Sequence, residues 1–127
     1  MPKRILIVDD NEDSCRIFSQ SLTREGYAVT LAKDGDEALR KIGWIQPDLI
    51  LLDVMMPGVD GMRVSRTLKQ NSSYKFIPIL MVSARFDDPA FREQGLAAGA
   101  AETLRKPIDL SDLLANVRKH LNETDQA

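Results

Sequence analysis

Cysteine is nearly absent from this chain, whose 127 residues contain only one, Cys15. A single cysteine cannot form an internal disulfide, and Cys15 fits the role of a small core residue of a helix. The chain also lacks a charged-then-apolar leader and any apolar run long enough to span a bilayer. These absences predict a protein of the reducing cytoplasm that makes no contact with a membrane.

An excess of charge of one sign is also lacking, because 17 basic residues nearly balance 19 acidic ones and the net charge is -2. Nucleic acids and anionic membranes attract basic surfaces, so we expect neither as a partner of this domain. A hydrophobic content of 43% over 127 residues suits one domain with a single core. We expect that domain to cover residues 1–121, with residues 122–127 as a frayed C-terminal tail.

Short aliphatic runs alternate with longer amphipathic segments along the chain. The aliphatic runs predict strands, at 5–8, 28–31, 49–52, 77–82 and 103–104. The amphipathic segments predict helices, near 11–25, 36–41, 62–70, 89–98 and 110–121. This alternation indicates an α/β fold, in which the continuously apolar first, third and fourth runs are central strands and the other two are edges. Pro78 should mark the entrance of the fourth strand.

Acidic side chains stand at the ends of two of the apolar runs. Asp9 and Asp10 end the first run, and Asp53 closes the third. A lysine, Lys106, precedes Pro107 near the C-terminal end. Three acids and one amine at strand ends indicate a phosphate and metal site.

Four motifs of the chain resemble, in their order, those of the receiver domain of bacterial two-component response regulators. They are the segments 8–11 (VDDN), 48–61, 83–84 (SA) and 106–107 (KP). One such segment is weakly specific, but four in order at strand ends are highly specific and cover essentially the whole chain. The resemblance implies a flavodoxin-like (βα)5 fold, a doubly wound sheet of five parallel strands in the order 2-1-3-4-5.

The resemblance also implies a role for each acid. Asp53 would be the phosphoacceptor; Asp10 and Asp53 would bind Mg²⁺ together with the backbone carbonyl of Met55, and Asp9 would hold a metal-bound water. In such a sheet these acids point into the crevice beyond the first and third strands, where a divalent cation relieves their mutual repulsion. The alternative is that the acids of segment 9–13 merely favour the positive N-terminus of the following helix. That alternative suits Glu12 and its neighbour better than the strand-end acids.

The chemistry implied for Asp53 is nucleophilic attack. An ionised carboxylate can attack a phosphoryl group without a general base and form an acyl phosphate. Mg²⁺, the ammonium group of Lys106 and the hydroxyl group of Ser83 would then meet the charge on the phosphoryl oxygens. An ordinary surface lysine and a strand-end serine are the alternatives. The place of Lys106 before Pro107, similar to the family's Lys-Pro with a cis peptide bond, favours the functional interpretation.

The predicted function is that of a signalling receiver and not of a turnover enzyme. Its donor would be a sensor histidine kinase or a histidine phosphotransfer protein, and its output a downstream protein target or an output domain, with dimerisation on phosphorylation as a further option. One alternative is an N-terminal receiver fragment of a larger regulator. Another is a metal-dependent aspartyl phosphohydrolase, although the Asp-x-Asp-x-Thr pattern of such enzymes is missing. A degenerate receiver would have lost an acid or the lysine, and none is missing.

Some positions depart from the family pattern, and others do not indicate a function. The position usually held by an aromatic switch residue is Thr103, so we expect the response to pass mainly through segment 83–86 and the start of the helix near 89–98. Met55 and Arg85 occupy variable positions that set the lifetime of the acyl phosphate in the family. We expect His120 to be a surface residue and Trp44 to be partly buried.

Overall fold

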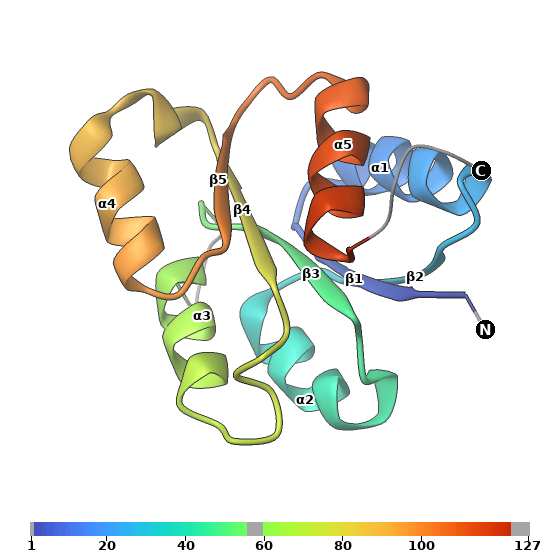
Figure 1. Cartoon of the computed structure of the whole chain (residues 1–127), viewed down its shortest axis with the longest axis horizontal. Helices are drawn as coiled ribbons and strands as arrows, with labels where there is room; N and C mark the ends of the chain where they lie inside the picture. Colours follow the sequence, from blue (N-terminus) through green and yellow to red (C-terminus); the bar gives the residue numbers. More distant parts are fainter. Residues whose placement is uncertain (1, 56–59, 123–127) are drawn as a thin grey trace.

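The computed structural model describes residues 2–55 and 60–122. Five parallel strands form a central sheet with helices on both faces (Figure 1). The strands are β1 (Arg4–Val8), β2 (Ala28–Ala32), β3 (Leu49–Asp53), β4 (Ile79–Ser83) and β5 (Glu102–Arg105). Their order is β2-β1-β3-β4-β5, so the predicted fold class and strand order are both confirmed.

The helices divide between the two faces of the sheet. They are α1 (Glu12–Arg24), α2 (Gly35–Ile45), α3 (Gly61–Lys69), α4 (Pro89–Ala97) and α5 (Leu110–His120), with a short 3-10 helix η1 (Ala84–Asp87) before α4. Buried side chains of α1 and α5 pack in one apolar cluster, and those of α2, α3 and α4 pack in the other. Covering both faces explains why β1, β3 and β4 read as unbroken apolar runs.

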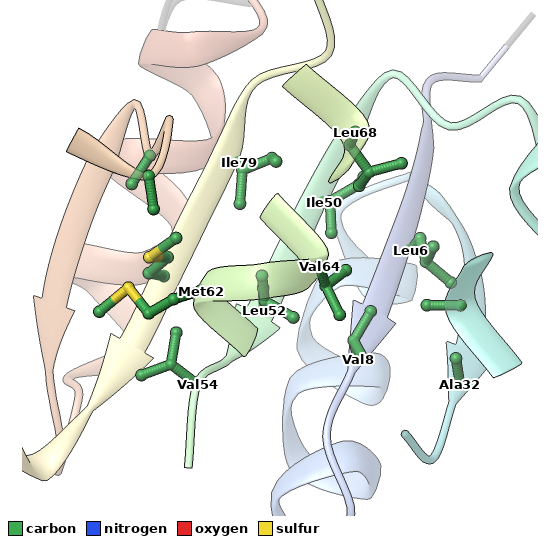
Figure 2. Close-up of a cluster of buried hydrophobic side chains, with 14 of the residues drawn as sticks. Leu6, Val8, Ala32, Ile50, Leu52, Val54, Met62, Val64, Leu68 and Ile79 are labelled. Atoms are coloured by element: carbon green, nitrogen blue, oxygen red, sulfur yellow. The ribbon is translucent and has the colours of Figure 1, made fainter. Parts of the chain in front are cut away.

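Alternate residues of the central strands supply the two clusters, because successive side chains of a strand point to opposite faces. In β1, Leu6 and Val8 face α2 and α3, whereas Ile5 and Ile7 face α1 and α5. Figure 2 shows the first of these clusters, in which Val64 of α3 lies over the sheet. Each of these five side chains is at most 1% exposed, so the sheet is rigidly held beneath the loops at its carboxyl edge.

Each helix begins at a polar residue whose side chain accepts a hydrogen bond from a backbone N–H of the first turn. These capping residues are Asn11, Asp34, Asp60, Asp88 and Asp109. Such a cap satisfies one of the N–H groups that the first turn leaves without a partner, and it contributes about 1 kcal/mol to stability. The caps therefore set the point at which each loop after a strand ends.

Several boundaries differ from those expected. β4 begins at Ile79 and not at 77, because Pro78 cannot donate to the ladder; its carbonyl instead accepts from the Ile50 N–H at 3.0 Å. α2 runs from 35 to 45, well beyond the expected 36–41, and ends where Gln46 adopts a positive φ of 49°.

One expectation about a single residue was wrong. Trp44 is 70% exposed, because it lies away from the buried stripe of Ala38, Ile42 and Ile45 on α2. His120 is partly exposed at the end of α5, and its Nε2 lies 2.8 Å from Glu102 Oε2. Cys15 is buried in the α1–α5 cluster, as expected.

Within the described residues, no helix is long and apolar enough to cross a membrane. The expected tail 122–127 lies outside those residues except for Asn122. The motif residues 56–59 lie outside them as well.

Candidate functional site

The three predicted acids meet at the carboxyl edge of the sheet. Asp53 is the last residue of β3, and Asp9 directly follows β1, whose Val8 pairs with Leu52. Asp10 is the next residue along the chain. One carboxylate oxygen from each acid lies within 4.8 Å of the others. Because β1 and β3 are neighbours in the sheet, they bring together carboxylates that are more than 40 positions apart in the sequence.

Asp9 is the acid whose protonation the site affects most. It is only 4% exposed, and burial raises its pKa from 3.8 to about 6. The N–H of Asn11, at 2.9 Å from Asp9 Oδ1, and the ammonium of Lys106 oppose this rise, while the charge of Asp53 adds to it. Asp10, in contrast, is exposed to solvent. An ionised Asp9 is therefore costly until a cation compensates its charge.

Lys106, which directly follows the edge strand β5, brings a positive charge into the acid cluster. Its Nζ lies 3.2 Å from Asp53 Oδ2 and 3.8 Å from Asp9 Oδ2. The peptide bond between Lys106 and Pro107 is cis, as the resemblance implied, and the Lys106 N–H donates to the carbonyl of Ser83 at 3.1 Å. The lysine therefore joins the end of β5 to the acids of β1 and β3.

Ser83 ends β4 beside Asp53, because Asp53 pairs with Val82. It is only 1% exposed, and its Oγ accepts a hydrogen bond from the Arg85 N–H at 3.0 Å. A hydroxyl oxygen that accepts this bond can still donate its own proton. Ser83 therefore has a hydroxyl proton to offer to an anion, and the same oxygen caps the start of η1.

The two oxygens of Asp53 already have defined surroundings. Oδ1 accepts a hydrogen bond from the Met55 N–H at 2.9 Å, and Oδ2 faces Lys106. Met55 follows the strand and is 54% exposed. Its backbone carbonyl as a metal ligand stays a prediction from the resemblance.

The donor set fits a small, hard divalent cation. Carboxylate oxygens of Asp9, Asp10 and Asp53 are the ligand type that Mg²⁺ prefers, and few protein ligands suit an ion that keeps several waters. The raised pKa of Asp9 points the same way, because it reports negative charge that the protein alone compensates poorly.

Some contacts of the site escaped the sequence analysis. The N–H groups of Asn11 and Met55 each bond the aspartate two positions earlier, and the Cys15 Sγ lies 3.2 Å from the carbonyl oxygen of Asp9. The first two are Asx turns, which an aspartate at a strand end favours, so a local signal was present. The thiol contact depends on how α1 packs against the sheet and has no local signal.

Known proteins of one family are similar to this chain in sequence and in fold. The profile described as the response regulator receiver domain matches residues 5–118. Response regulator PleD of Caulobacter vibrioides is 47% identical over 118 residues, which are 93% of this chain and 26% of that protein. Response regulator MprA of Mycolicibacterium vanbaalenii is 46% identical over 124 residues, which are 98% of this chain and 52% of that protein.

Solved structures give the same result. The chemotaxis response regulator CheY4 of Vibrio cholerae superposes with a TM-score of 0.89 at 34% identity, over 94% of this chain and 99% of that one. A putative response regulator from Chloroflexus aurantiacus gives a TM-score of 0.91 at 34% identity, over 97% of this chain and 100% of that one. The chain belongs to the receiver domain family of response regulators, the proteins of two-component signalling. It spans 26% and 52% of the lengths of PleD and MprA.

Proposed function

We propose that this receiver domain accepts a phosphoryl group on Asp53 and changes its affinity for a partner as a result. The observation that carries the proposal is the convergence of three acids, one lysine and one buried hydroxyl at a single edge of the sheet. Phosphoryl transfer needs positioning and charge compensation more than covalent chemistry, and this set of groups supplies both.

The transfer exchanges one bond to phosphorus for another. A carboxylate oxygen of Asp53 forms the new O–P bond while the N–P bond of a phosphohistidine breaks. The electron pair of that bond stays on the imidazole, which takes up a proton from solvent, and the product on the chain is an acyl phosphate. The carboxylate needs no general base, in keeping with the absence of a histidine from the site residues described above.

Two groups of this chain stabilise the transferred phosphoryl group, and a third positions the carboxylate that accepts it. The ammonium of Lys106, now 3.2 Å from Asp53 Oδ2, moves its interaction to a phosphoryl oxygen. The hydroxyl of Ser83 donates to another, and the N–H of Met55 holds the attacking carboxylate in place. Asp10 and Asp53, with the Met55 carbonyl, would hold Mg²⁺, and Asp9 would hold a water bound to the metal; the ion would supply positive charge at the site.

The donor that we propose is a sensor histidine kinase or a histidine phosphotransfer protein. A donor that delivers its phosphoryl group to Asp53 has to cover the neighbouring surface. An open groove of about 390 Å³ lies there, with Lys106 in its wall beside the apolar side chains of Ile17 and Leu110. These two side chains are 47% and 38% exposed, and burying them would contribute to donor affinity.

The signal then passes to a downstream protein target or to an output domain, and phosphorylation can favour a dimer. We place this activity in the cytoplasm, where the buried thiol of Cys15 stays reduced. An N-terminal receiver of a larger regulator and a free-standing regulator would use the same site. They would differ only in whether the output comes from a domain of the same protein or from a separate target. The aspartyl phosphohydrolase alternative is disfavoured because Asn11 stands where its pattern needs a second aspartate.

The proposal is tested by phosphorylation from a small acyl phosphate with Mg²⁺. Intact-mass analysis should show the gain of one phosphoryl group per chain, and the modification should be lost in base, as an acyl phosphate is. Asp53→Asn should abolish it, because the amide is not a nucleophile towards phosphorus. Asp112→Asn is the matched control, since Asp112 is an exposed aspartate of α5 and is not one of the site residues.

The same measurement separates the proposal from its rivals. Modification of Asp53→Asn at the wild-type level would overturn the assignment of the phosphoacceptor. A wild-type chain that never accumulates the modified form while it continues to release phosphate would favour the hydrolase.

A further inference from the structure

The two edge strands of the sheet, β2 and β5, differ in the charges that they carry (Figure 1). β5 has the sequence ETLR, with a charged residue at each end, whereas β2 has the sequence AVTLA, without a charged residue or a proline. Charged residues and prolines are common means by which an edge strand avoids pairing with another chain. β2 contains neither, so any protection of its edge must come from another part of the molecule.

The outer edge of β2 is formed by the backbone of its odd-numbered residues. The Ala28 N–H donates to the carbonyl of Lys3 at 2.9 Å. The Ala32 carbonyl accepts from the Asp9 N–H at 3.0 Å, so the even-numbered residues face β1. The N–H and the carbonyl of one strand residue point to the same side, and the side alternates along the strand. The backbone groups of the odd-numbered residues therefore point away from β1, where a further strand would pair.

Two side chains of α2 bind two of these outward groups. Glu37 Oε1 accepts a hydrogen bond from the N–H of Lys33, the residue after β2, at 2.8 Å. Lys41 Nζ, one turn further along α2, donates to the carbonyl of Leu31 at 3.3 Å. The two side chains also form an ion pair, with 3.5 Å between Lys41 Nζ and Glu37 Oε1. One ion pair thus covers both a donor and an acceptor at the carboxyl end of this edge.

These contacts keep Glu37 ionised. The hydrogen bond from the Lys33 N–H lowers the pKa of Glu37, and the charge of Lys41 lowers it further against the opposing effect of burial. A glutamate three residues after a helix N-cap, here Asp34, can also serve the start of the helix as part of a capping box. That local role involves neither Lys41 nor the Leu31 carbonyl, so it accounts for only half of the contact.

The same edge carries an exposed apolar side chain beside a groove. Leu31 is 41% exposed, and it pairs with Ile7, whose side chain lies in the cluster beneath α1 and α5. An open groove of about 600 Å³ lies along this edge, with Leu31 and Lys33 in one wall and Cys15 and Ser19 of α1 in the other. A strand added to the edge would cover Leu31 and part of the groove, and burial of that apolar surface would favour the pairing.

We propose that the Glu37–Lys41 pair closes the outer edge of β2 against antiparallel pairing with the same edge of a second copy of this chain. Two identical strands complement each other about a two-fold axis, because the outward donors of one meet the outward acceptors of the other. The axis keeps the Leu31 side chains of both copies on one face of a continuous sheet, where they can cover each other. The inference does not depend on phosphoryl transfer to Asp53.

The closed edge has an energetic consequence for self-association. A second copy can pair with this edge only after Glu37 has left the Lys33 N–H and Lys41 has left the Leu31 carbonyl. Each charge-assisted hydrogen bond that has to be displaced lowers the association constant about tenfold. The two bonds together therefore lower it about a hundredfold.

Sedimentation velocity over a range of protein concentrations tests this inference. The double variant Glu37→Ala/Lys41→Ala opens the edge and should dimerise about a hundredfold more tightly than the wild-type chain. Asp36→Ala/Arg40→Ala is the matched control, because it removes an acid and a base at the same spacing from exposed positions of α2 and leaves the net charge unchanged. The control should sediment as the wild type does.

A milder variant covers the case in which the double variant does not fold. Circular dichroism would establish the folded state of each protein. Lys41→Met keeps an apolar stem and leaves Glu37 at the start of the helix, and it should strengthen dimerisation about tenfold. Arg40→Met has the same change of charge at an exposed position and is its control.

Two further measurements locate the association at the edge. In dilute, monomeric samples, the Lys33 amide should exchange its hydrogen slowly in the wild type and faster in Glu37→Ala. Leu31→Lys, added to the double variant, places a charge on the open edge and should return the chain to a monomer.

Several outcomes would overturn the inference. One is a folded double variant, or a Lys41→Met variant, that associates no more than its control. Another is equal association of the two double variants, because the loss of any ion pair from α2 would then be sufficient. Dimers that persist with Leu31→Lys would place the contact elsewhere. A Lys33 amide that exchanges equally fast in wild type and Glu37→Ala would show that the edge is not closed.

Discussion

Asp9 offers a quantitative test of the electrostatics of the site. The change is Asp9→Asn, which keeps the shape of the side chain and an oxygen that can accept from the Asn11 N–H, now at 2.9 Å from Oδ1. The amide has no charge at any pH. It therefore removes the ionised form that burial makes costly, and we expect the variant to be more stable than the wild-type chain near neutral pH without divalent cations.

The size of the effect follows from the raised pKa of Asp9. A pKa raised from 3.8 to about 6 means that the folded protein binds a proton more tightly than the unfolded chain. At about 1.4 kcal/mol for each pKa unit, ionised Asp9 costs about 3 kcal/mol. Satisfying the amide N–H groups in a buried site offsets about 1 kcal/mol of the gain. The net gain is about 2 kcal/mol, or about 8 °C at roughly 4 °C per kcal/mol for a domain of this size.

The pH dependence of the gain has a definite sign. Protonated Asp9 stabilises the wild-type protein fully below pH 3.8, and this contribution is lost as the pH rises through about 6. Asp9→Asn should therefore be about 1 kcal/mol less stable than wild type at the acidic end and become the more stable of the two as the pH rises towards neutrality. Urea unfolding followed by circular dichroism, at a series of pH values in chelator, would measure this separation.

Mg²⁺ should reverse the order. Binding to the folded state raises the stability of the wild type in proportion to the logarithm of the Mg²⁺ concentration, and Asp9→Asn should gain less. Asp112→Asn, exposed on α5, is the control and should show neither effect. An Asp9→Asn variant that is no more stable than wild type in chelator, or whose gain does not vary with pH, would refute this account of the site.

Two further expectations concern Lys106 and Gly61, the first residue of α3. Lys106→Ala should keep Mg²⁺ binding, measured by titration, but lose the amide shifts that a phosphoryl mimic causes at Ser83; a variant that still responds would show that another donor couples the strands. Gly61→Ala would place a methyl group 2.6 Å from the backbone Cα of Val54, so thermal unfolding should show a loss of about 1–3 kcal/mol. Gly43→Ala, which meets only a side-chain hydroxyl at 3.4 Å, should gain up to about 1 kcal/mol. Equal changes in stability for Gly61→Ala and Gly43→Ala would contradict the close approach of Gly61 to the backbone of Val54.

The alternation of strands and helices could be predicted because it is a local property of the sequence. Unbroken apolar runs mark strands covered on both faces, and the runs at β1, β3 and β4 became the three central strands. The strand order came only through the resemblance, since no periodicity states which strands are neighbours. Helix ends were less predictable: α2 extends to Ile45 because of its packing, and this extension carries Trp44 onto the exposed side.

The residues that form the site could also be predicted, for a related reason. Carboxyl ends of parallel strands share one edge of a sheet, so acids that close apolar runs, such as Asp9 and Asp53, meet there once the strands are neighbours. Lys106 was also recognised from its place near the C-terminal end, and the resemblance added Ser83 and gave both residues a role; Ser83 ends β4 and Lys106 follows β5, so neither comes from the strands of the acids. The sequence could not rank the acids, however, and it is the loop after β1 that buries Asp9 while leaving Asp10 exposed.

The sequence by itself determined the α/β class, the central strands and the types of group at the strand ends, because each depends on neighbours within a few positions. The tertiary structure alone decided the 3.2 Å approach of Lys106 to Asp53, the raised pKa of Asp9 and the hydrogen bond from Ser65 to the Ala98 carbonyl. Each of these depends on how helices pack against the sheet and bring distant segments together. No local pattern encodes such distances, which follow from the close packing of the whole core.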